Sequence, residues 1–149
     1  MCNNCKQWFH LVSSIIGIIL GGAAFVVFFC VYENIDAGFW GFLSGVFAMV
    51  CFHLHYLHIR QKLDTWHSAD TLRGIKVLGM MGTLAGMAGL IWYIFIAQYH
   101  HIPVMPVRTS MYIAAVWSFM TAKWGLSLFL YCRMYVRILV GHDPPLISI

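Results

Sequence analysis

Charged side chains are scarce in this sequence: 9% of its 149 residues are Asp, Glu, Lys or Arg, whereas 61% are hydrophobic. Soluble domains carry roughly 25% charged and about 45–50% apolar residues, so the composition excludes an ordinary soluble domain. The formal net charge of +4 comes from few, scattered basic residues, which argues against nucleic-acid binding. The chain is therefore expected to lie in a lipid bilayer.

Four apolar stretches are long enough to cross the hydrocarbon core, which takes about 20 helical residues. They cover approximately residues 11–31, 37–57, 75–98 and 111–131. The first exceeds the roughly 7–15 apolar residues of a signal peptide, so we expect a retained span. The sequence predicts an all-α polytopic membrane protein, with one four-helix transmembrane domain over residues 1–149 and a short tail at 132–149. No room is left for an extramembrane catalytic domain, so no enzyme is expected.

Basic residues flanking the spans predict the orientation, because Lys and Arg tend to stay cytosolic. An even number of spans puts both termini on one side of the membrane. Seven basic residues lie on that side, against Arg108 alone on the other: Lys6, Arg60, Lys62, Arg73, Lys76, Arg133 and Arg137. Both termini are therefore expected to be cytosolic, with the 32–36 turn and the 99–110 loop exoplasmic.

Glycines four residues apart recur in three spans, a spacing that lets helix backbones approach closely. They serve either packing within one bundle or a homo-oligomer interface: Gly17 and Gly21, Gly41 and Gly45, Gly82 and Gly86. The sequence leaves both alternatives open.

The five cysteines predict no disulfide framework, since three lie in or beside spans and two on the predicted reducing side. Cys2 and Cys5 form only half of a zinc site. The alternatives for these two cysteines are S-acylation or a plain reduced thiol.

Lys123 is the main ionisable residue at membrane depth, where such residues are costly and mark candidate functional sites. Ser127 and Tyr131 follow at intervals of four residues and form a polar stripe with it. An anion could follow this stripe towards the cytosol. The alternative is a snorkelling lysine or one paired with a carbonyl.

Histidines are concentrated at the end of the second span, as His53, His55 and His58. His55 and His58 share a helix face, whereas His53 points elsewhere. His100 and His101 lie in the exoplasmic loop. Neutral imidazole is a good ligand for zinc, copper or haem iron, and the alternative is a packing role.

The spans contain no acidic residue, which argues against transport of a metal dication, and the methionines are too dispersed for a copper(I) path. Haem fits better, because its iron takes His or Tyr, its ring contacts aromatic side chains and its propionates pair with Lys or Arg.

The segment from Val116 to Trp124, followed by Tyr131-Cys-Arg-Met-Tyr135, resembles the last span and tail of the heme-responsive-gene (HRG) family of four-span haem transporters. The resemblance extends to His53-Leu-His55 and to Trp8-Phe9-His10. It implies movement of haem, as transported substrate, towards the cytosol from outside the cell or from an endolysosomal lumen. Plasma membrane and endosome or lysosome are both expected locations, and Tyr135 to Ile138 and Asp143 to Ile147 resemble endosomal sorting signals.

The resemblance also implies roles for individual residues. His55 corresponds to the family's second-span haem ligand, and His100 or His101 to its exoplasmic loop ligand. The aromatic-basic tail motif Phe-Ala-Arg-Lys-Tyr falls on residues 131–135, where Arg133 and Tyr135 match, Tyr131 replaces Phe, and Met134 replaces a base. The expected haem-binding residues are thus His53, His55, His100, His101, Lys123, Tyr131, Arg133 and Tyr135, with the iron held by His55 and His100.

Two other classes remain open on the sequence. A b-type membrane cytochrome would hold haem permanently, normally between histidines of two helices, but the third and fourth predicted spans contain none. A tetraspan scaffold without a ligand would explain the glycines and leave Lys123 unexplained.

Overall fold

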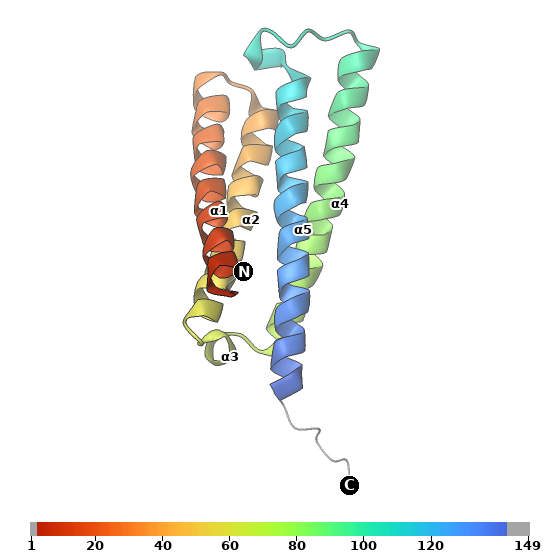
Figure 1. Cartoon of the computed structure of the whole chain (residues 1–149). Helices are drawn as coiled ribbons and strands as arrows, with labels where there is room; N and C mark the ends of the chain where they lie inside the picture. Colours follow the sequence, from red (N-terminus) through yellow and green to blue (C-terminus); the bar gives the residue numbers. More distant parts are fainter. Residues whose placement is uncertain (1–2, 143–149) are drawn as a thin grey trace.

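The computed structural model describes residues 3–142, with side chains for residues 8–141, and all the regular structure there is helical (Figure 1). The elements are α1 (Asn3–Ala24), which continues as the π-helical η1 (Phe25–Val31), then α2 (Ile35–Ile59), α3 (Leu63–Trp66), α4 (Ala69–Tyr99), the 3-10 turn η2 (Val107–Thr109) and α5 (Met111–His142). Helices at Trp8–Val31, Ile35–Ile59, Ala69–Tyr99 and Met111–Gly141 are long and apolar enough to cross a membrane. The predicted all-α polytopic class is confirmed. Cys2, the side chains of Cys5 and Lys6, and the 143–147 sorting pattern lie outside the described part.

The helices form two hairpins side by side, α1 with α2 and α4 with α5 (Figure 1). α5 packs against both α4 and α2 and so joins the hairpins. The core lies where α2 faces α5 and contains Cys51, Leu54, Leu128, Cys132 and Tyr135, all with no measurable exposure. Many other apolar side chains point outwards, as expected for helices surrounded by lipid.

The glycines let the helices approach. A Cβ on Gly21 would lie 2.6 Å from the Gly45 backbone, and one on Gly86 would lie 2.6 Å from the backbone N of Ala122. The remaining members of the three predicted pairs also meet residues of the same chain: Gly17 meets Trp124, Gly41 meets Ala24, and Gly82 meets Phe47. Packing within one bundle therefore accounts for the contacts of all six glycines.

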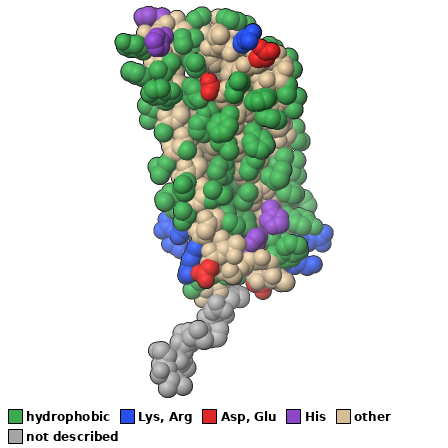
Figure 2. Space-filling model, turned by 180° about the vertical axis from the view of Figure 1, so that it is seen from behind, with side chains coloured by type: hydrophobic (Ala, Val, Ile, Leu, Met, Phe, Trp, Pro, Cys, Tyr) green, Lys and Arg blue, Asp and Glu red, His purple; other side chains and the backbone are tan. Residues whose placement is uncertain are grey.

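Polar side chains close the end of the bundle that carries the 100–110 loop. The Asn34 side chain accepts a hydrogen bond from the Ala37 N–H (3.0 Å) and so caps α2, and its amide donates to the carbonyls of Val107 (2.8 Å) and Ser110 (3.1 Å). Arg108 pairs with Glu33 across the same end at 2.6 Å. In the view of Figure 2, Lys and Arg side chains gather at the opposite end.

α5 continues as helix to His142, beyond residue 131 where the fourth predicted span ends. Arg133, Tyr135 and Arg137 therefore have helical geometry: the two arginines, four residues apart, share one face, and Tyr135 points about 200° away from either. This geometry decides how the predicted tail motif is arranged.

Candidate functional site

His55 lies near the end of α2 and is only 5% exposed. Its Nδ1 shares a 2.8 Å hydrogen bond with the hydroxyl of Tyr135, which is itself fully buried on α5. Its other ring nitrogen, Nε2, is buried and has no hydrogen-bond partner among the described residues. A neutral imidazole whose Nδ1 keeps its hydrogen presents a lone pair at Nε2, which is the atom that binds a metal ion.

A second imidazole, that of His10 on α1, lies beside His55. The two rings are nearly parallel, at 11°, with centroids 5.5 Å apart. The Tyr131 hydroxyl lies 2.9 Å from His10 Nδ1, and the Tyr131 ring approaches His55 edge-on at 4.2 Å. We call His10, His55, Tyr131 and Tyr135 the imidazole cluster. It brings three predicted site residues together with one that the sequence reasoning did not select.

The signal for His10 was present in the sequence. His10 precedes Ser14, Gly17 and Gly21 at helical spacing, so it continues the small-residue face by which α1 contacts its neighbours. A histidine in line with such a face is expected to point into the bundle.

A groove between α1 and α5, of about 260 Å³, contains Lys123. We call it the α1/α5 groove, and it is lined by Phe9, Ser13 and Ile16 of α1 and by Met120, Lys123 and Trp124 of α5. The Lys123 ammonium lies 3.8 Å from the centre of the Trp124 ring, a cation–π contact, and its side chain is exposed. The indole N–H of Trp124 is buried and finds no acceptor among the described residues. The Lys123 ammonium thus offers a charged donor to an anion in the groove.

The predicted polar stripe links the groove to the imidazole cluster. Ser127 donates a hydrogen bond to the Lys123 carbonyl (2.9 Å), and Tyr131 follows one turn later inside the cluster. Eight residues separate Lys123 from Tyr131, which corresponds to roughly 12 Å along the axis at about 1.5 Å per residue.

Arg133 lies elsewhere on α5. It is exposed and lines, together with Arg137, a second groove of about 520 Å³ on the outer face of the helix, which also includes Leu130, Met134 and Ile138. Tyr135 points into the core instead. The structure therefore divides the predicted tail motif between an inner aromatic face and an outer basic face, and Arg137 joins Arg133 on the latter.

His53 points away from His55, as its spacing predicts. It is exposed, and its Nε2 lies 3.4 Å from Nε2 of His67, in the link between α3 and α4. Partial burial, and then the neighbouring His53, lower the pKa of His67 and so favour its neutral form. Among the residues described, no group of three or more His, Cys, Asp or Glu side chains could hold a metal ion.

His100 and His101 are both exposed, at the loop end of the bundle. His100 ends α4, and His101 follows with a positive φ of 51°. Since α2 runs from the loop end to the imidazole cluster, its residues 35–55 separate the two sites by roughly 30 Å at about 1.5 Å per residue. The structure does not bring these histidines near His55.

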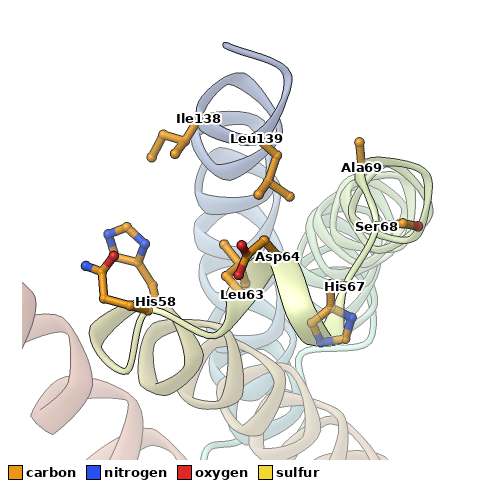
Figure 3. Close-up of a pocket in the computed structure, with 9 residues that line it drawn as sticks. His58, Leu63, Asp64, His67, Ser68, Ala69, Ile138 and Leu139 are labelled. Carbon is orange, nitrogen blue, oxygen red and sulfur yellow. The ribbon is translucent and has the colours of Figure 1, made fainter. Parts of the chain in front are cut away.

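A further pocket of about 530 Å³ opens at the basic end of the molecule, among α2, α3, the start of α4 and the end of α5 (Figure 3). We call it the terminal pocket. Its lining includes His58, Asp64 and His67, with Leu63, Ile138 and Leu139 as apolar wall.

The comparison with known proteins agrees with the four-span fold. A family described as "Haem-transporter, endosomal/lysosomal, haem-responsive gene" matches residues 72–124. The chain thus has the four spans of a small multi-pass membrane protein and is similar, over residues 72–124, to a family of haem transporters. The chain is also 27% identical over 153 residues to the heme transporter hrg-1 of Caenorhabditis elegans, covering 97% of this chain and 78% of that protein. The predicted resemblance to the heme-responsive-gene family is confirmed, and the family description names the endosome and lysosome, one of the two expected locations. No solved structure matches the chain significantly.

Proposed function

We propose that this protein carries haem across the membrane towards the cytosol, without covalent chemistry, and that the imidazole cluster and the α1/α5 groove form one haem site. The observation that supports this most is the buried Nε2 of His55 without a hydrogen-bond partner among the described residues. In the proposed site this nitrogen binds the iron, while Nδ1 donates its hydrogen to the Tyr135 oxygen. His10 is the second ligand, because its ring lies against that of His55.

The porphyrin then extends from the cluster along the groove, against Phe9, Ile16 and Trp124. One propionate reaches the Lys123 ammonium and the Trp124 indole N–H, roughly 12 Å from Tyr131 along α5 at about 1.5 Å per residue. This length is on the scale of a porphyrin ring with its carboxylate arms. His100 or His101 captures haem first at the loop end, and His53 is an exposed ligand at the opposite end.

The charge distribution supports the direction. Arg133 and Arg137 share one groove at the end where Lys and Arg gather, and we propose that this end faces the cytosol, as do both termini. Propionates leaving Lys123 would meet these arginines next. A second copy of the chain is not required, because the six glycines already pack within one bundle.

Haem titration of the protein in nanodiscs, followed by Soret absorption, tests the iron site. His55→Ala should abolish the Soret shift, and His10→Ala should weaken binding. Thermal unfolding of each variant shows whether the fold is retained. An unchanged Soret titration for folded His55→Ala would overturn the assignment of this ligand.

Lys123→Met tests the propionate contact. A charge-assisted hydrogen bond contributes about 1.5–3 kcal/mol, so haem affinity should fall roughly 10- to 100-fold. Haem dimethyl ester, which lacks the carboxylates, should bind wild type and variant equally. Lys76→Met serves as the matched control, since Lys76 lies on α4 away from the groove. Equal losses for haem and its ester would contradict a propionate contact.

A resident haem is the second candidate, because His10 and His55 supply imidazoles from two helices of one chain. A b-type cytochrome would retain haem stoichiometrically through purification. A transporter should instead give up its haem to excess apomyoglobin.

A further inference from the structure

The terminal pocket begins one helical turn beyond the imidazole cluster. His58 follows His55 at i+3 on α2, so the two side chains are neighbours on one helix face. The His58 ring lies 4.8 Å from the ring of Tyr135, whose hydroxyl shares the hydrogen bond with His55. His58 is half-buried and also lines the terminal pocket. It is therefore the side chain that connects the buried site with the surface.

We infer that the terminal pocket is the exit site for haem, and that His58 takes the iron from His55. This inference rests on the proposed function. The step is a ligand exchange in which one Fe–N bond to His55 breaks as one Fe–N bond to His58 forms. Both imidazoles are neutral before and after, and the iron keeps its charge, so the step needs no reductant or proton donor.

The pocket lining suits an amphiphilic ring that must leave. Leu63, Ile138 and Leu139 provide apolar contact for a porphyrin, and His67 adds an imidazole on another wall (Figure 3). Asp64 carries a negative charge into the same pocket and repels propionates. The pocket therefore holds the ring and disfavours its carboxylates, which makes retention weak.

A path for the carboxylates exists next to the pocket. Ile138 lines both the terminal pocket and the groove of Arg133 and Arg137. A porphyrin in the pocket can thus direct its propionates past Ile138 towards the arginines, away from Asp64. Ring and carboxylates have separate surfaces on the same end of α5.

The inference predicts that exit can be slowed without loss of binding. Nanodisc protein loaded with haem is mixed with excess apomyoglobin, and the transfer rate is followed by absorption. His58→Ala should slow transfer about tenfold while the Soret titration of the His55 site stays as in wild type. Leu139→Trp fills the pocket without removing an imidazole and should slow transfer similarly. Val140→Trp, an exposed neighbour on the same turn and outside the pocket lining, should transfer at the wild-type rate.

Two outcomes overturn the inference. The first is wild-type transfer by His58→Ala and Leu139→Trp with haem binding intact, which leaves the proposed haem site standing. The second is equal slowing by Leu139→Trp and Val140→Trp, because the slowing would then come from any bulky side chain on this part of α5 and not from a blocked pocket. Absence of any Soret shift in the wild-type protein would instead refute the proposed function, and it would refute the exit site as well.

Discussion

At the scale of single residues, the arrangement of residues 131–135 changes how the tail motif is understood. As a linear motif, Tyr131, Arg133 and Tyr135 form one aromatic-basic unit. On a helix, Tyr131 and Tyr135 lie one turn apart, whereas Arg133 points about 200° away from either. The tyrosines accordingly meet His10 and His55, and Arg133 faces outwards. One short segment thus contributes to the proposed iron site on one face and to the arginine groove on the other.

Tyr135 orients the His55 ring in the proposed site, and this can be tested without changing packing. Tyr135→Phe keeps the buried ring and removes the hydroxyl that pairs with Nδ1. Loss of such an outer partner typically costs about 10- to 100-fold in metal affinity, so haem affinity should fall by that amount in a Soret titration.

The matched control is Tyr112→Phe. In the unsubstituted chain, the Tyr112 hydroxyl accepts a 3.1 Å hydrogen bond from Gln98 at the loop end of the bundle. It should bind haem as the wild type does. Equal affinity for Tyr135→Phe and wild type would refute the orienting role.

At the scale of helices, the sequence predicted four helices long and apolar enough to cross a membrane, because apolar length is the dominant constraint in a bilayer. It also placed Lys123 at membrane depth, and the glycine spacing marked the faces that now meet inside the bundle. It could not predict that α5 continues to His142, because the amphipathic residues beyond the span are equally compatible with a continued helix and with a non-helical tail. His10 was missed because it precedes the first predicted span, which begins at residue 11, and because its neighbour His55 is supplied by another helix, α2.

The contact between α1 and α2 predicts opposite effects for adjacent glycines. A Cβ on Gly21 would lie 2.6 Å from the Gly45 backbone, whereas a Cβ on Gly22 meets nothing within 4 Å. Gly21→Ala should destabilise the bundle by about 1–3 kcal/mol through overpacking. Gly22→Ala should be neutral or stabilising, since alanine favours helix by roughly 1 kcal/mol over glycine.

Thermal unfolding in detergent compares the two variants under identical conditions. Because both substitutions gain the same helix propensity, the difference between them measures the close approach of the helices. Equal melting temperatures would show that α1 and α2 do not approach at Gly21.

At the scale of the whole molecule, the two ends of the helical bundle differ in their charge and in the polar side-chain contacts that they contain. The loop end carries Arg108, paired with Glu33, whereas Lys and Arg side chains gather at the opposite end (Figure 2). We expect the loop end to face the lumen or exterior. An Asn-x-Ser acceptor with a Gly-Ser spacer, inserted at residues 102–105, should be glycosylated in microsomes.

The same insertion at residues 60–62, in the link between α2 and α3, should remain unglycosylated. Glycosidase treatment, read as a mobility shift on a gel, checks both. The reverse pattern would invert the proposed topology and, with it, the direction of transport.

The Lys123 side chain is exposed on a helix that crosses the bilayer, so the α1/α5 groove opens sideways onto the acyl chains. In the proposed site, a lipophilic cargo that dissolves in the leaflet is already enriched beside its receptor and diffuses to it in two dimensions. Uptake should then depend on partitioning between membrane and water more than on dissolved concentration. Porphyrins of graded lipophilicity would rank accordingly as competitors.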